Sequence, residues 1–281
     1  MSSLTKKEKR KKTKKAIQNY KQEWRDTLMD SFISWIGGKK LLRKVICSRF
    51  PENGYDRYIE GFGGAAWVLF HKEKHAKMEV YNDINSELVN LFKCVKHHPN
   101  AIQEELEYFL NSREMFNDCK ELYKKSELTD IQRAARYYYM IKVSYGSKTK
   151  DYGTKGRDTT RTEYLKIIKE RLKAVSIENK SYEALIKQYD RQSSLFYCDP
   201  PYYGSEKLYD TAGTTFDNAQ HVKLRDTLFN IKGKCLISYN NTDFIKELYQ
   251  GFNISEIERQ NNLGSRYLKN KEYKELIITN Y

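Results

Sequence analysis

The chain has 281 residues, of which 39% are hydrophobic, so it is long enough to bury one large core or to fold as two domains. Its formal net charge of +14 indicates a polyanionic partner such as nucleic acid, although charge alone does not separate DNA from RNA or anionic lipid. No apolar run approaches the roughly 18 residues of a membrane span, and residues 1–15 lack the apolar centre of a secretory signal, so we expect a cytoplasmic protein without membrane segments.

Residues 1–30 are expected to form a basic N-terminal tail. Lysine and arginine crowd into positions 6–15, with only Glu8 opposing them. Such a block of like charge repels itself, so we expect the tail to be disordered on its own. It could grip the phosphates of a nucleic acid, or it could be a merely solvated extension.

The pattern from residue 31 to residue 98 predicts alternating strands and helices. We expect strands that end at Glu60 and that span 78–81, followed by helices over 65–74 and 86–95 respectively. Residues 99–171 then read as polar and helical, without a convincing strand, and a basic, glycine-containing break covers 146–161. We interpret 99–171 as an inserted helical domain that carries one long functional loop.

Strands resume in the last part of the chain, where residues 172–281 return to the α/β pattern. The expected strands cover 175–179, 195–198, 234–239, 253–257 and 275–281, and the expected helices cover 219–230 and 243–250. We therefore predict one α/β domain built from 31–98 and 172–281, interrupted by the helical insertion.

Asp199-Pro200-Pro201-Tyr202 follows the strand expected at 195–198. Two prolines have no N–H to donate to a sheet, and they stiffen the chain at the strand end where open α/β sheets bind ligands. The Asp199 carboxylate and the Pro200 carbonyl are two acceptors beside the flat ring of Tyr202, an arrangement that suits a planar base with an exocyclic amine. The alternative is a proline turn with a capping aspartate.

A glycine-rich turn follows the strand that ends at Glu60, and it continues through Phe62 and Gly64. Such a turn lets a ligand approach the backbone closely. Asp83 ends the next strand twenty positions after Gly63 (83 − 63), where an acidic residue commonly binds ribose hydroxyls. The chain has no G-x-x-x-x-G-K-[ST] sequence, so the turn suits a nucleoside cofactor such as S-adenosylmethionine better than a triphosphate.

Trp35-Ile36-Gly37-Gly38-Lys39 offers an aromatic platform and a cation for a cofactor carboxylate. The alternative is that Trp35 is a core residue and Lys39 a surface charge. A metal is not expected, because the five cysteines are scattered and the pair His71 and His75 has no third ligand in view.

In this order, these motifs resemble the Dam-type, D12-class DNA adenine-N6 methyltransferases, from about Phe32 to Tyr281. The motifs are W-x-G-G-K, E-x-F-x-G, N-D-I-N, a helical segment, D-P-P-Y and L-I-S-Y-N. The resemblance implies a Rossmann-like methyltransferase fold of the α-group, in which the inserted helices form the target-recognition domain. The chain departs from the family at Gly61 and Ala66, where proline and glycine are frequent.

The resemblance also implies roles for individual residues. The implied S-adenosylmethionine ligands are Trp35, Lys39, Glu60, Phe62, Gly64, Asp83 and Asp199, with Asp83 on the ribose and Asp199 near the methionine amino group. The implied catalytic set is Asp199, Pro200, Pro201 and Tyr202, which would bind an adenine flipped out of duplex DNA, accept hydrogen bonds from its N6 and stack on its ring.

Contacts to DNA are expected from Tyr145, Lys148, Lys150 and Arg157, because the loop that holds them mixes cations with polar side chains and Ser144 to Lys148 resembles the start of the family's DNA-reading loop. We expect double-stranded DNA as the partner and a monomeric enzyme. Two alternatives remain open: methylation of cytosine N4, since D-P-P-Y serves any exocyclic amine, and an inactive DNA-binding protein with this fold.

Overall fold

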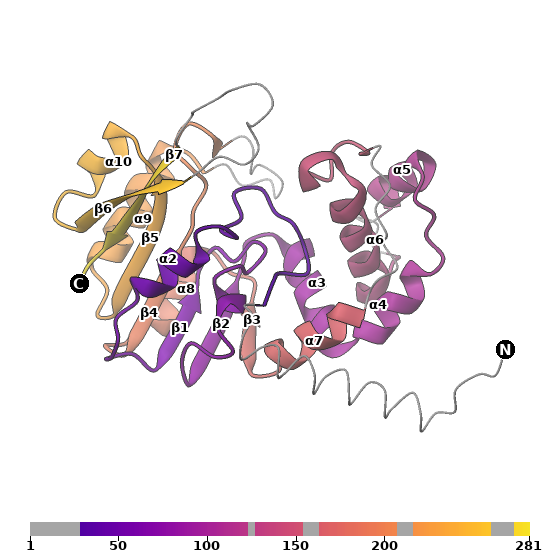
Figure 1. Cartoon of the computed structure of the whole chain (residues 1–281), viewed down its shortest axis with the longest axis horizontal. Helices are drawn as coiled ribbons and strands as arrows, with labels where there is room; N and C mark the ends of the chain where they lie inside the picture. The colour runs from indigo at the N-terminus through magenta and orange to yellow at the C-terminus, as the bar shows by residue number, and fades with distance from the viewer. Residues whose placement is uncertain (1–28, 123–126, 154–162, 207–215, 260–272) are drawn as a thin grey trace.

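Seven strands form one sheet in the computed structural model, which describes residues 29–122, 127–153, 163–206, 216–259 and 273–281 (Figure 1). Their order across the sheet is β3-β2-β1-β4-β5-β7-β6. The first five run parallel, whereas β7 runs antiparallel between β5 and β6. The strands are β1 (Arg57–Glu60), β2 (Met78–Asn82), β3 (Val175–Glu178), β4 (Ser194–Cys198), β5 (Lys234–Asn240), β6 (Asn253–Arg259) and β7 (Tyr273–Thr279).

The central strands β1, β4 and β5 are buried along most of their length because helices cover both faces of the sheet. Tyr58 of β1 packs into the core on one face and Ile59 into the core on the other. The first face is covered by α2 (Arg43–Ser48) and α3 (Ser86–His97), and the second by α8 (Tyr182–Tyr189), α9 (Asn218–Phe229) and α10 (Asp243–Leu248). The α/β fold predicted from the sequence is confirmed, and it is consistent with a Rossmann-like methyltransferase.

The chain order reverses between β1 and β4, which lie side by side although more than 130 residues separate them (194 − 60 = 134). Glu60 at the end of β1 pairs in register with Tyr197 of β4 and Tyr81 of β2. The carboxyl ends of these parallel strands therefore meet at one edge of the sheet, which is the usual ligand position in such folds.

The helical segment gathers beside β3 (Figure 1). It comprises α4 (Pro99–Leu106), α5 (Arg113–Leu122), α6 (Asp130–Val143), the 3₁₀ turn η2 (Tyr145–Ser147) and α7 (Glu163–Leu172). The helix α6 begins at a capping box of Thr129 and Gln132, which explains its sharp start. Tyr138 of α6 stacks near Phe32, which in turn meets Phe92 of α3, so these helices share one core with a face of the sheet.

The helix predicted over 65–74 is wrong. Only the 3₁₀ turn η1 (Leu69–His71) forms there, because Gly64 and Ala66 adopt left-handed backbone angles, with φ of +48° and +56°. A helix cannot continue through such residues. Two short helices, α2 and α8, were not predicted, whereas the other expected strands and helices agree to within a few residues.

Residues 1–28 of the predicted tail lie outside the described residues, and so do parts of the two basic loops, 154–162 and 260–272. The last two residues of the predicted tail, Met29 and Asp30, are described. Met29 packs into the core, and Asp30 forms ion pairs with Lys40 and Arg43. Across the ranges that are described, no helix is long and apolar enough to span a membrane.

Candidate active site

A cavity of about 310 Å³ lies at the carboxyl ends of the parallel strands. Five stretches that are far apart in the sequence line it, namely 35–39, 60–68, 82–85, 180–183 and 199–201, together with side chains from the helical segment. Nine of the predicted cofactor and catalytic residues are among the lining residues: Trp35, Lys39, Glu60, Phe62, Gly64, Asp83, Asp199, Pro200 and Pro201. The structure thus brings the candidate cofactor residues and the candidate catalytic residues to one cavity.

At Gly63 and Gly64 the turn is packed so tightly that side chains are excluded. A Cβ atom on Gly63 would lie 2.2 Å from the ring of Tyr81, and one on Gly64 would lie 2.9 Å from Trp35. The Tyr81 hydroxyl donates to the Gly64 carbonyl at 2.8 Å, which fixes the turn from below. The N–H of Gly61 donates to the Tyr197 carbonyl at 2.9 Å, a bond that the proline frequent at this position in the family could not make.

Asp83 holds the turn with its side chain. Its Oδ2 accepts from the N–H of Gly64 and its Oδ1 from the N–H of Asn85, both at 2.8 Å. Burial raises the pKa of Asp83, and the N–H donors oppose this shift because they stabilise the carboxylate. Each oxygen has a further lone pair, so the side chain can accept from a ligand hydroxyl while it keeps these bonds.

Asp199 is bound by a cation and a hydroxyl. Lys39 Nζ lies 2.7 Å from Asp199 Oδ1, and Ser238 Oγ donates to the same oxygen at 2.9 Å. Lys39 is only 4% exposed, so the interpretation of this lysine as a surface charge is wrong. Burial raises the pKa of Asp199, and the Lys39 ammonium opposes the rise. The lysine therefore favours the carboxylate form of Asp199.

Tyr202 is the predicted catalytic residue that does not line the cavity. Its ring lies beneath the Lys39 ammonium, 4.7 Å from Nζ to the ring centroid. Its hydroxyl donates to Oε2 of Glu275, a buried residue of β7, at 2.6 Å. The Tyr202 side chain therefore lies beside Asp199, and its hydroxyl is bound by a residue of β7.

Glu60 is a buried carboxyl group with neutral donors around it. The Tyr58 hydroxyl donates to its Oε2 at 2.7 Å, and the Leu69 backbone donates to it as well. Burial raises the pKa of Glu60 to about 8, and the negative charge of Asp199 adds to the rise. Glu60 is therefore largely protonated near neutral pH in the ligand-free protein.

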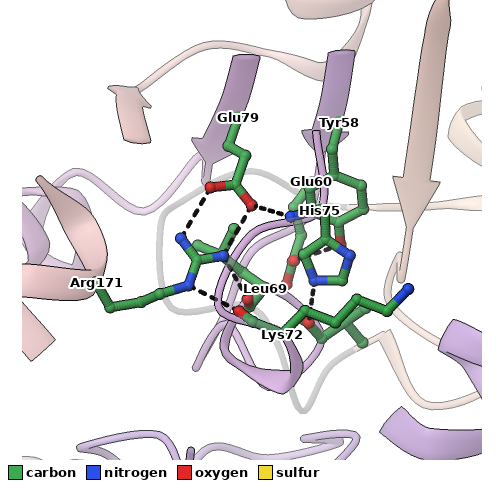
Figure 2. Close-up of polar contacts among 8 residues, drawn as sticks. Tyr58, Glu60, Leu69, Lys72, His75, Glu79 and Arg171 are labelled. Carbon is green, nitrogen blue, oxygen red and sulfur yellow. Dashed lines mark hydrogen bonds and ion pairs between the residues drawn. The ribbon is translucent and has the colours of Figure 1, made fainter. Parts of the chain in front are cut away.

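A second carboxylate near Glu60 is fully paired, and it organises the irregular segment after β1 (Figure 2). Arg171, from the end of α7, forms a two-pronged ion pair with Glu79 of β2, with distances of 2.8 and 2.9 Å. The same guanidinium donates to the carbonyls of Leu69 and Lys72. Both charged groups are nearly inaccessible to solvent. The arginine therefore links the segment that carries the glycine turn firmly to β2.

We predict that Glu60→Gln stabilises the ligand-free protein above neutral pH. A carboxyl group whose pKa is higher in the folded than in the unfolded protein destabilises the folded state when it is ionised. The free energy of unfolding of the wild type should therefore fall as the pH rises from about 4.5 to about 8. Glutamine removes this dependence. The variant should gain about 4 kcal/mol at pH 8 and almost nothing near pH 4.5, as measured by urea unfolding at both pH values. An equal difference at the two pH values would contradict the prediction.

Several residues of the site were not predicted from the sequence, although Asn82 opens the N-D-I-N motif. Asn82 joins two loops, because its Nδ2 donates to the carbonyls of Gly61 and Lys180. Tyr182 and Phe216 form an aromatic wall with Phe62, with ring centroids 5.7 and 5.9 Å from that of Phe62. The L-I-S-Y-N motif could have indicated Ser238, but α8 was not predicted, so Tyr182 could not be found.

The predicted DNA-binding residues are divided between cavity and surface. Tyr145 is 75% exposed and Lys150 is exposed, whereas Lys148 lines the cavity. Arg157 lies outside the described residues. The loop around Lys148 holds Gly146, Ser147 and Thr149 in left-handed conformations, which is a strained arrangement for the two non-glycine residues.

No group of three or more histidine, cysteine, aspartate or glutamate side chains that could hold a metal ion occurs within the described part of the chain. His75, one of the two histidines considered as ligands, stacks on Tyr58 with ring centroids 4.3 Å apart, and burial lowers its pKa to about 3.

Comparison with known proteins agrees with this geometry. The family model for the D12 class N6 adenine-specific DNA methyltransferases matches residues 35–263. The chain is similar to the Type II methyltransferase M1.LlaDCHI of Lactococcus lactis subsp. cremoris, with 29% identity that covers 89% of this chain and 95% of that protein. It is also similar to the DNA adenine methylase of Haemophilus influenzae, with 25% identity, 88% of this chain and 92% of that protein.

Proposed function

Because the chain belongs to the D12 class of N6 adenine-specific DNA methyltransferases, we propose that it transfers a methyl group from S-adenosylmethionine to N6 of an adenine flipped out of duplex DNA. The observation that carries the proposal is the meeting of the glycine turn, Asp83 and Asp199 in one cavity. Methyl transfer between two bound molecules needs their sites to adjoin, because the rate depends mainly on positioning.

The family assignment decides between the enzymatic alternatives. The matched family and the named adenine methylases act on adenine, so the chain is an adenine-N6 DNA methyltransferase and not a cytosine-N4 enzyme. The family assignment also excludes the alternative of an inactive DNA-binding protein, since the family and the relatives are enzymes.

The residues of the cavity fit S-adenosylmethionine. The side-chain-free turn at Gly63 and Gly64 leaves room for close approach, and Asp83 has lone pairs for ribose hydroxyls. Lys39 is paired with Asp199, whereas Glu60 and Asp83 are bonded to neutral donors. When bound, the cofactor supplies an electrophilic methyl group on its sulfonium.

The catalytic role falls to the turn that begins at Asp199. The lone pair of adenine N6 is delocalised into the ring, so the amine is a weak nucleophile. Hydrogen bonds from its two N–H groups to the Asp199 carboxylate and the Pro200 carbonyl orient it and increase its electron density. As the methyl group passes from the sulfonium to N6, Asp199 would stabilise the positive charge that develops on N6, and N6 would then release one of its two protons to solvent to give neutral N6-methyladenine. Tyr202 contributes a stacking surface, and Pro201 keeps the turn rigid.

The test is the chemical identity of the product. Purified protein is incubated with S-adenosylmethionine and duplex DNA, and the digested nucleosides are separated by mass spectrometry. We expect N6-methyladenine. The same assay on single-stranded DNA tests whether a duplex is required, because only in a duplex must the target base be unpaired before it is methylated. N4-methylcytosine, or no methylated base, would overturn the proposal.

We predict that Asp83→Ala weakens S-adenosylmethionine binding by about 1–3 kcal/mol. The substitution removes the acceptor proposed for the ribose and also leaves the Gly64 and Asn85 N–H groups without their partner. Isothermal calorimetry measures the loss. Asp83→Asn is the matched control, since it keeps one acceptor oxygen and should lose less. Unchanged affinity in both variants would show that Asp83 is not at the cofactor site.

DNA binding is proposed for the helical segment 99–171, as an inserted target-recognition domain, and for the basic tail. The proposal for Tyr145 and Lys150 is supported by their exposure, and the tail adds positive charge. Lys148 lines the cavity, so it is proposed to act where the flipped base enters. Arg157 is proposed on the sequence alone.

A further inference from the structure

Three side chains on adjacent strands hold the turn that follows β4. Ser238 of β5 donates to Asp199 at 2.9 Å, and Asn240 of β5 donates to the Tyr203 carbonyl at 2.9 Å. Glu275 of β7 accepts from the Tyr202 hydroxyl at 2.6 Å. Asn240 and Glu275 are register partners across the two strands. The turn is therefore fastened at three points to a region that is distant in sequence.

Glu275 is placed where an acidic side chain needs a strong partner. It is 3% exposed, and a buried carboxylate is costly unless it receives hydrogen bonds. A 2.6 Å bond from a hydroxyl is in the range of charge-assisted hydrogen bonds. Its negative charge also acts on the neighbouring site, because it contributes to the raised pKa of Asp199.

We propose that Glu275 is a positioning residue for methyl transfer, which fixes the plane of the Tyr202 ring against the flipped adenine. The inference rests on the proposed function, in which Tyr202 is the stacking residue. A phenylalanine would offer the same stacking face, so the hydroxyl contributes by its bond to Glu275. The rigid turn fixes the backbone of Tyr202, and Glu275 binds its hydroxyl. The two restraints together define one orientation of the ring.

The alternative role for Glu275 is electrostatic, through Asp199. The two roles are separable, because Glu275→Gln removes the charge and retains an acceptor oxygen, whereas Glu275→Ala removes both. Positioning predicts that Gln is tolerated and Ala is not. An electrostatic role predicts that both variants change the pH dependence of the rate to the same extent.

The experiment compares Glu275→Gln, Glu275→Ala, Tyr202→Phe and the double variant Tyr202→Phe with Glu275→Ala. We expect single-turnover rates about 10-fold below wild type for Ala and Phe, near wild type for Gln, and no further loss in the double variant, because both changes remove the same bond. The KM for S-adenosylmethionine should stay unchanged. Duplex DNA with 2-aminopurine at the target position should fluoresce more strongly with the slow variants, since looser stacking quenches less.

The matched control is Tyr189→Phe. Tyr189 donates to Glu178 at 2.6 Å, a tyrosine–glutamate pair of the same length that does not involve the lining of the cavity. It should leave the rate and the fluorescence unchanged. A wild-type rate for both Tyr202→Phe and Glu275→Ala would overturn the inference. So would additive losses in the double variant.

Failure of the inference is distinguishable from failure of the proposed function. If Tyr202→Ala is slow while Tyr202→Phe and Glu275→Ala are normal, Tyr202 stacks but Glu275 does not position it. If Tyr202→Ala is itself normal, the stacking role in the proposed function is wrong, and the inference falls with it. Equal thermal unfolding temperatures of the slow variants and Tyr189→Phe would show that the loss of rate is not a loss of folding.

Discussion

Asp199→Ala is expected to methylate DNA at least about 100-fold more slowly than the wild type, because it removes the acceptor proposed to stabilise positive charge on N6. Single-turnover kinetics with saturating S-adenosylmethionine measure the methylation step. The change has a second consequence in this structure, since Lys39 loses its partner at 2.7 Å and becomes a buried, unpaired ammonium. A loss of activity could therefore reflect a loss of folding.

The double variant Lys39→Met with Asp199→Ala separates these effects. It leaves neither charge behind and keeps most of the side-chain volume at position 39, so it should be more stable than Asp199→Ala alone. Its methylation rate should nevertheless be as low. Ser238→Ala is a milder control, because it removes one of the two contacts to Asp199 Oδ1 and retains the ion pair. A rate near that of wild type in the double variant would refute the role of Asp199.

Gly63→Ala is expected to abolish most cofactor binding, with an affinity loss of at least about 10-fold, corresponding to about 1.4 kcal/mol. Its Cβ would lie 2.2 Å from the Tyr81 ring, which is itself bonded to Gly64 and stacked on Phe92 at 4.1 Å. The ring cannot retreat, so the turn must shift, and overpacking of this kind also destabilises by about 1–3 kcal/mol. Calorimetry with S-adenosylmethionine and urea unfolding measure both losses.

Gly61→Ala is the matched control within the same turn. Its Cβ would meet the Cys198 Sγ at 3.6 Å, which is an ordinary contact, and it retains the N–H that donates to Tyr197. It should bind the cofactor within a few-fold of wild type. Equal losses for the two alanines would mean that the turn responds to any side chain and that the close approach at Tyr81 is not the cause.

Local sequence signals predicted the strands and the ends where ligands bind. Glu60, Asp83 and Asp199 each follow or end an apolar run, and parallel strands bring such ends together. The helix predicted after β1 failed because its apolar residues pack in an irregular segment. Gly64, which has a left-handed angle, contacts Tyr81, Asp83 and Trp35, partners that a short window of sequence does not contain.

Contacts between residues that are distant in sequence could not be predicted for a different reason. Glu275 and Arg171 occupy ordinary positions in a strand and a helix, and no spacing connects them with Tyr202 or Glu79. Their roles arise from strand order, which places β7 beside β5, and from the packing of α7 against the segment after β1. Lys39 was singled out by its motif, but its partner, Asp199, was not predicted from it.

The clamp formed by Arg171 has a consequence for chimeras that would test the target-recognition role proposed for residues 99–171. A segment swap that replaced 99–171 with the counterpart from a relative would also replace the arginine that holds the carbonyls of Leu69 and Lys72. A counterpart without this arginine would leave the buried Glu79 with the His75 N–H as a donor and no cation. The C-terminal junction of such a swap therefore belongs ahead of Glu163, so that α7 remains with the scaffold whose glycine turn it supports.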